Sequence, residues 1–273
     1  MKYMTFNFSC SFAGVANMLA QYGIETTDRD IALTMKLPFL FAYADGAYLS
    51  GPMLQSAGWF DLYLNPLGYR LVEKWIPAGE LADYLKAQTT AMIGIRMEDA
   101  GKHAVVYNGR ENHRFVFINN KWEDENSPER ISLDREELIQ RVDAEVAVAT
   151  LQQISPRNVD FLEKLGESIT VLRDNVSEIK QLCHTEVSVV TLHSKLNTLF
   201  RPLFLDGITM LNMIGEAELA GEFALLQQGL LTAIRQEAEQ NIILKEYICI
   251  EKLEDCAEKY IALIRREADA LTL

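Results

Sequence analysis

Residues 10–23, CSFAGVANMLAQYG, decide how the first half of the chain is interpreted. The residues after Cys10 have a helical pattern, and the terminal glycine is a typical helix stop. The small side chains of Ala13, Gly14 and Ala16 would let this helix pack closely against its neighbours. A thiol directly before a helix meets partial positive charge and unpaired N–H groups, which lower its pKa and can bind an oxyanion. Cys10 is therefore the candidate nucleophile, with an ordinary buried cysteine as the alternative.

A second stretch, residues 103–119, supplies candidate partners for that thiol. It contains two strand patterns joined by the short polar link 110–113, which predicts an antiparallel hairpin. The start of one strand of a hairpin lies beside the end of the next, so we expect His103 and Asn119 to be neighbours. The Asn119 amide oxygen can accept one imidazole N–H and leave the other ring nitrogen for the thiol. Asn120 is the nearest rival for this orienting role.

The rest of the first half predicts an α+β domain, with helices before an antiparallel sheet. Further strand patterns cover 91–97 and 145–152, and the region 37–75 has no clear pattern apart from one helix. Asp134 is a good N-cap for the helix that follows it. The expected helices are 28–35, 51–62, 77–86 and 135–142.

The second half predicts an all-α helical bundle of four to six helices. Apolar residues recur at helical spacing from Phe161 onward, and we place the boundary at about residue 154. The expected domains are therefore 1–154, carrying the thiol, and 155–273. Helical patterns in the second domain cover 161–172, 187–200, 203–214, 216–234 and 237–270.

Composition and charge exclude several classes of function. The formal net charge of −13, without any Lys/Arg-rich run, disfavours a nucleic-acid partner. No stretch approaches the roughly 20 apolar residues of a membrane span, and the first ten residues do not resemble a secretory signal. We therefore expect a cytoplasmic protein with free thiols. No His, Cys, Asp or Glu residues are spaced as metal ligands, so we expect neither a metal nor a cofactor.

Residues 10–23 resemble the nucleophile helix of the bacteriocin-processing, double-glycine-leader cysteine peptidases. The segment from His103 through Val105, Gly109 and Val116 to Asn119 is similar to their His strand, glycine turn and Asp/Asn strand. The chain also resembles the N-terminal domain of butirosin biosynthesis protein H, over about residues 8–152. These resemblances imply a papain-like cysteine peptidase fold with a catalytic Cys-His-Asn set. The butirosin resemblance further implies acyl transfer from a carrier-protein thioester to an amine.

Three residues outside the Cys-His-Asn set are further candidates for the site. The peptidases carry a Gln before the cysteine that helps to form the oxyanion hole; here Asn7 is the candidate for that position. Trp59 and Tyr63 are candidates for lining the substrate cleft, with a role in the core as the alternative.

Three functions follow as expectations. The first is an enzyme that forms an acyl-enzyme on Cys10 and transfers the acyl group from a thioester or amide, as in secondary metabolism. The second is a cysteine peptidase of the leader-processing type, and the third is a non-catalytic papain-like binding module. The expected partners are a small-molecule or peptide acyl substrate and an acyl carrier protein. A homodimer through the C-terminal helices is a further expectation.

Overall fold

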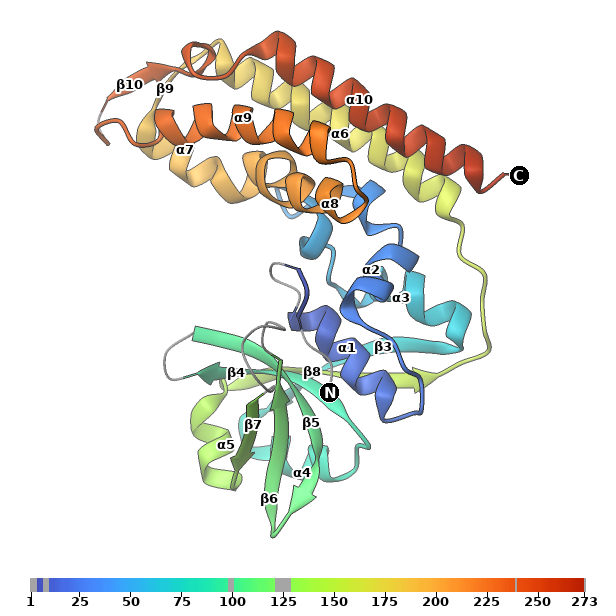
Figure 1. Ribbon diagram of the computed structural model, residues 1–273. Coiled ribbons are helices and arrows are strands. Elements are labelled where there is room, and N and C mark those ends of the chain that lie inside the picture. The colour runs from blue at the N-terminus through green and yellow to red at the C-terminus, as the bar shows by residue number, and fades with distance from the viewer. Residues whose placement is uncertain (1–3, 7–9, 98–100, 121–128, 239, 273) are drawn as a thin grey trace. The chain divides into compact units, whose positions relative to one another are not determined.

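The computed structural model describes residues 4–6, 10–97, 101–120, 129–238 and 240–272 and divides them into two compact units (Figure 1). The first unit comprises residues 1–35 and 55–159, and the second comprises 36–54 and 160–273. The division differs from a single boundary near residue 154, because the segment 36–54 forms one unit with the C-terminal helices.

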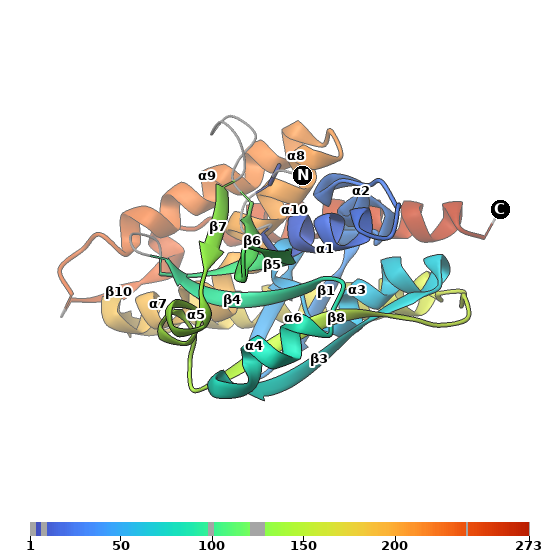
Figure 2. The ribbon, with the colours of Figure 1, turned by 90° about the horizontal axis from the view of Figure 1, so that it is seen from below.

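A six-stranded antiparallel sheet forms the centre of the first unit, in the order β3-β8-β4-β5-β6-β7 (Figure 2). The hairpin of β5 and β6 is present as expected, and its tight turn places Asn112 and His113 in left-handed conformations. Two edge strands, β3 and β7, were not expected, because β3 is largely solvent-exposed and β7 is only five residues long, without an apolar run. The strands are β3 (Tyr69–Pro77), β4 (Ala91–Met97), β5 (Gly101–Glu111), β6 (Arg114–Asn119), β7 (Glu129–Leu133) and β8 (Glu145–Gln153).

Five α-helices accompany this sheet within the described residues. Helix α1 packs against β4 and β5, and α4 and α5 pack against the sheet through a separate apolar core. The helix expected over 51–62 is shorter, because Pro52 lies in a 3₁₀ turn and the helix begins only at Ala57. The helices are α1 (Cys10–Ala20), α2 (Asp28–Thr34), α3 (Ala57–Leu64), α4 (Ala78–Lys86) and α5 (Arg135–Arg141).

Helix α1 approaches the sheet closely, as its small residues predict. A Cβ on Gly14 would lie 2.5 Å from the Met92 sulfur of β4, so only glycine fits without a shift of that side chain. One turn further on, the Asn17 amide donates a 2.6 Å hydrogen bond to Asn120 Oδ1, next to the end of β6. Both asparagines are buried, so this bond ties the helix to the sheet in a setting from which water is excluded.

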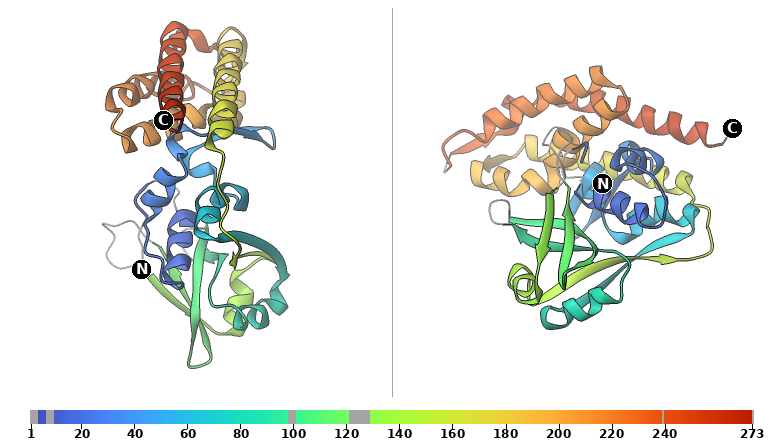
Figure 3. Two further views of the ribbon diagram at one scale, coloured as in Figure 1. Left: turned by 90° about the vertical axis from the view of Figure 1, so that its right-hand side faces the viewer. Right: turned by 60° about the horizontal axis from the view of Figure 1, so that its bottom comes forward.

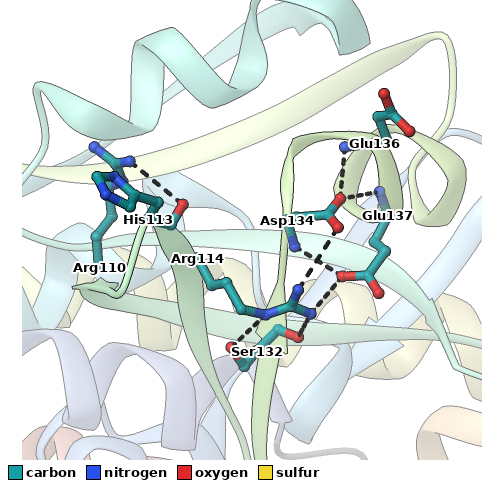
Figure 4. Close-up of polar contacts among 7 residues, drawn as sticks. All are labelled: Arg110, His113, Arg114, Ser132, Asp134, Glu136 and Glu137. Atoms are coloured by element: carbon teal, nitrogen blue, oxygen red, sulfur yellow. Dashed lines mark hydrogen bonds and ion pairs between the residues drawn. The ribbon is translucent and has the colours of Figure 1, made fainter.

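Helix α5 is held to the sheet by a polar cluster at its N-terminus (Figure 4). Asp134 accepts hydrogen bonds from two backbone N–H groups of the first turn and, with Glu137, forms a capping box. Arg114 of β6 pairs with Glu137 and also bonds to Ser132 of β7. The cap predicted from Asp134 is therefore confirmed.

The second unit combines a hairpin from the first half of the sequence with C-terminal helices. The hairpin joins β1 (Phe41–Ala44) to β2 (Ala47–Ser50) through Asp45 and Gly46, whose φ angles of 52° and 77° are those of a tight two-residue turn. Buried hydrogen bonds attach this segment to the helices: Phe41 N–H donates to Ser168, and the Tyr260 hydroxyl donates to Pro38 at 2.7 Å.

The long helices α6 (Phe161–Cys183) and α10 (Ile250–Ala270) run side by side in this unit (Figure 3). In the sequence between α6 and α10, helix α7 (Val189–Lys195) continues through π-helical turns over 196–200 and 202–207 into α8 (Ile208–Met213). Helix α9 (Ala217–Ala233) follows. The expected helix over 237–270 is wrong in its first part, because β10 (Asn241–Ile243) pairs there with β9 (Glu186–Ser188). No helix in the described part of the chain has the length and apolarity to cross a membrane.

Candidate active site

Cys10 is the first residue of α1, and its half-buried thiol faces His103 near the start of β5. Burial alone would raise the pKa of the Cys10 thiol. The hydrogen bond and charge of His103 outweigh the effect of burial, together with hydrogen bonds from the Ala104 backbone N–H and the Ser11 side chain. The pKa of Cys10 is consequently lowered, so the thiolate, which is the nucleophilic form, is favoured.

The second member of the site is the His103 imidazole, which lies between Cys10 and Asn119. Its Nδ1 atom hydrogen-bonds to Asn119 Oδ1, across the hairpin that the sequence predicts. Because Nδ1 is used in this bond, Nε2 is the ring nitrogen left for the thiol. The expected proximity of His103 and Asn119 is confirmed.

The pKa of His103 is shifted in the opposite direction from that of Cys10. The hydrogen bond with Cys10 raises the pKa of the imidazole most, burial opposes it, and the Cys10 charge, Asn119 and Glu129 add to the increase. A lowered thiol pKa beside a raised imidazole pKa favours a thiolate–imidazolium pair. Such a pair combines a nucleophile with a proton donor for a leaving group.

The two adjacent asparagines have different partners. Asn119 contacts His103, whereas Asn120 accepts the hydrogen bond from Asn17 of α1. Asn119 also donates from Nδ2 to Glu129 Oε2 at 3.0 Å. Sequence reasoning did not identify Asn17 or Glu129. Their contacts depend on the position of α1 on the sheet and on the register of β6 against β7, neither of which a local pattern specifies.

The remaining expected site residues have varied positions. Asn7, the oxyanion candidate, lies outside the described residues. Trp59 is partly buried on α3. The Tyr63 hydroxyl, on the same helix, donates a 2.9 Å hydrogen bond to Thr26, and the side chain is 8% exposed. Tyr63 thus has a partner in the protein, and no hydrogen bond or ring contact among the described residues joins either aromatic residue to Cys10.

The other cysteines provide a contrast with Cys10. All four thiols are free. Burial raises the pKa of Cys183 to about 11, and burial together with the Glu222 carboxylate raises that of Cys256 to about 12. Cys249 is exposed. Among the residues that the structure describes, no group of three or more His, Cys, Asp or Glu side chains is arranged to hold a metal ion.

Comparison with known proteins gives a structural similarity of low degree. The peptidase domain of Streptococcus ComA, a bi-functional ABC transporter involved in a quorum-sensing pathway, is 15% identical to this chain. The match covers 54% of this chain and 96% of that domain, with a TM-score of 0.36. No protein-family model and no curated protein matches the chain.

Proposed function

We propose that the first unit is a papain-like cysteine peptidase that cleaves amide bonds through an acyl-enzyme on Cys10. The observation that carries the proposal is the hydrogen-bonded series Cys10–His103–Asn119, in which the pKa of the thiol is lowered and that of the imidazole is raised. This arrangement meets the chemical requirement for a thiolate nucleophile with an oriented acid–base partner.

The proposed reaction has two halves. The Cys10 thiolate attacks the carbonyl carbon of the scissile bond, and the imidazolium of His103 gives its proton to the leaving amine, which leaves a thioester on Cys10. Neutral His103 then removes a proton from water, whose oxygen attacks the thioester and releases the carboxylic acid. We assign the oxyanion of each tetrahedral intermediate to backbone N–H groups at the start of α1, because the first N–H groups of a helix have no partner within the helix.

Acyl transfer to an amine is the second candidate, because it shares the first half-reaction on Cys10. It differs only in the acceptor, with an amine in place of water resolving the thioester. No contact among the described residues favours an amine over water. Transfer from an acyl carrier protein and a role in secondary metabolism therefore rest on the sequence resemblance alone.

The proposal is tested first through the thiol, without knowledge of the substrate. Iodoacetamide alkylation of Cys10 is measured against pH by peptide mass spectrometry, in a Cys249→Ser background because the Cys249 thiol is exposed and would react as well. We expect reactivity to begin well below the ordinary thiol pKa of about 8.5. His103→Ala should return the onset to that value or above. An onset at the ordinary value in the unmutated site would contradict peptidase and transferase alike and favour the non-catalytic binding module.

Turnover is then tested with a mixture of synthetic peptides, analysed by mass spectrometry. Cleavage that Cys10→Ala abolishes supports the peptidase. Products that carry an added amine, formed only when an amine is supplied with an acyl thioester, support the transferase. An activated thiol with neither product would refute both reactions for these substrates.

A further inference from the structure

Glu129, the first residue of β7, lies beside the proposed catalytic series without being part of it. The register of the sheet places Glu129 directly opposite Asn119 of β6. Its carboxylate accepts a 3.0 Å hydrogen bond from Asn119 Nδ2, while Asn119 Oδ1 bonds to His103 Nδ1. The Asn119 side chain is 6% exposed, so few water molecules compete for these positions.

An asparagine needs such a neighbour if it is to orient a histidine. Its amide has one end that accepts and one that donates hydrogen bonds, and a 180° rotation exchanges them. Rotated, the amide would present N–H groups to the His103 N–H, and two donors would face each other. A carboxylate only accepts, so Glu129 holds Nδ2 on its own side and thereby directs Oδ1 toward His103.

The charge of Glu129 also favours a protonated His103. Among the described residues, the charges that raise the pKa of His103 come from the Cys10 thiolate of α1 and the Glu129 carboxylate of β7. Both favour the imidazolium. The nearby Arg130 is paired with Glu111 of β5. An aspartate at position 119 would instead set two carboxylates side by side, where like charges oppose joint ionisation.

We propose that Glu129 is a positioning residue that fixes the amide orientation of Asn119 and, through it, the tautomer and charge of His103. The site would then be a four-residue series, Cys10–His103–Asn119–Glu129, ending in a carboxylate. The inference rests on the proposed function for its catalytic meaning. The hydrogen-bonding role of Glu129, however, can be tested through the pH dependence of Cys10 alkylation alone.

The test uses the full chain in the Cys249→Ser background and the pH profile of Cys10 alkylation. Glu129→Gln keeps an oxygen acceptor for Asn119 but removes the charge that favours the His103 imidazolium. His103 should therefore lose its proton, and the thiolate–imidazolium pair should end, at a lower pH. Glu129→Ala removes both the acceptor and the charge and should also raise the pH at which the thiolate appears. Glu111→Gln is the matched control, because it removes a carboxylate from the same sheet without touching Asn119, and its profile should match the unmutated site.

A double variant separates positioning from simple structural damage. Asn119→Ala removes the amide through which Glu129 would act, so it should raise the pH at which the thiolate appears. Adding Glu129→Ala to Asn119→Ala should then raise that pH no further. Equal profiles support the inference, and a double variant whose thiolate appears at a clearly higher pH than in Asn119→Ala overturns it. So does a Glu129→Ala profile that superimposes on the unmutated one.

The outcomes also distinguish this inference from the proposed function. If Cys10 in the unmutated site has an ordinary pH profile, the proposed function fails. If Cys10 is activated but the Glu129 variants do not alter its profile, only the positioning role fails. Far-UV circular dichroism of each variant verifies that a changed profile comes from a folded protein.

Discussion

The neighbours Asn119 and Asn120 should have separable effects on reactivity and on stability. Asn120 is 1% exposed and accepts a 2.6 Å hydrogen bond from Asn17, which fastens α1 to the sheet. Asn119 instead contacts His103 and Glu129. Asn120→Ala should therefore lower the stability of the first unit, whereas Asn119→Ala should alter the chemistry of Cys10.

The size of the stability effect follows from the burial of the Asn17–Asn120 bond. Loss of one partner of a buried hydrogen bond costs about 1–3 kcal/mol in the free energy of unfolding. A domain of this size loses roughly 2–4 °C in melting temperature per kcal/mol. Asn120→Ala and Asn17→Ala should each fall in this range. Since both remove the same bond, the double variant should cost less than their sum by about 0.5–3 kcal/mol.

Two assays on the same preparations check this division. Urea denaturation gives the unfolding free energies for the double-mutant cycle, and the alkylation profile of Cys10 reports the active site. Folded Asn120→Ala should keep the profile of the unmutated site, while Asn119→Ala should shift the appearance of the thiolate to higher pH. The reasoning would be refuted by additive effects of Asn17→Ala and Asn120→Ala, or by an Asn120→Ala profile shifted as far as that of Asn119→Ala.

Three further predictions concern the framework of each unit. Tyr260→Phe removes a buried hydroxyl that donates to a backbone carbonyl, so it should lower the unfolding free energy measured in urea by about 1–3 kcal/mol. Tyr43→Phe is the control, because that side chain is 57% exposed, and it should change the unfolding free energy by less than about 0.5 kcal/mol. Burial raises the pKa of Asp206 to about 6, so the folded state binds this proton more tightly than the unfolded state. The stabilisation from this bound proton is fully present below about pH 4, and about 3 kcal/mol of unfolding free energy is lost as the pH rises through 6. Urea denaturation from pH 4 to 7 should show this loss in the wild type relative to Asp206→Asn. Gly14→Val places atoms against Met92 and should destabilise by about 1–3 kcal/mol, and a smaller loss in a Met92→Ala background would identify the clash as the cause.

Local sequence patterns predicted the elements that carry the proposed nucleophile and base. Helix α1, strands β4 and β6 and the cap at Asp134 have strong periodicity or end signals, and the structure has them within a few residues. The proximity of His103 and Asn119 was also predictable, because an antiparallel hairpin places the start of one strand beside the end of the next. In the observed register Asn119 pairs with Val105, two residues along β5 from His103.

Elements with weak local signals were missed. The edge strand β3 has a single buried residue, so its sequence lacks the alternation that identifies a half-buried strand. Strand β7 does alternate, but its signal is short, with only the two buried apolar residues Ile131 and Leu133. The hairpin of β1 and β2 did have a local signal, since Asp45-Gly46 between aromatic and apolar residues is typical of a two-residue turn. Its membership of the second unit, however, depends on hydrogen bonds to residues more than a hundred positions away, such as Ser168.

The sequence by itself determined the order Cys10, His103, Asn119 and the helix and strands on which they lie, because these depend on local periodicity and short-range pairing. Only the tertiary structure decided the surroundings of those residues. The register of β7 brings Glu129 to Asn119, and the close approach of α1 over Gly14 accompanies the bond between Asn17 and Asn120. The opposite pKa shifts of Cys10 and His103 arise from burial and from groups on different elements, which become neighbours only when the chain folds.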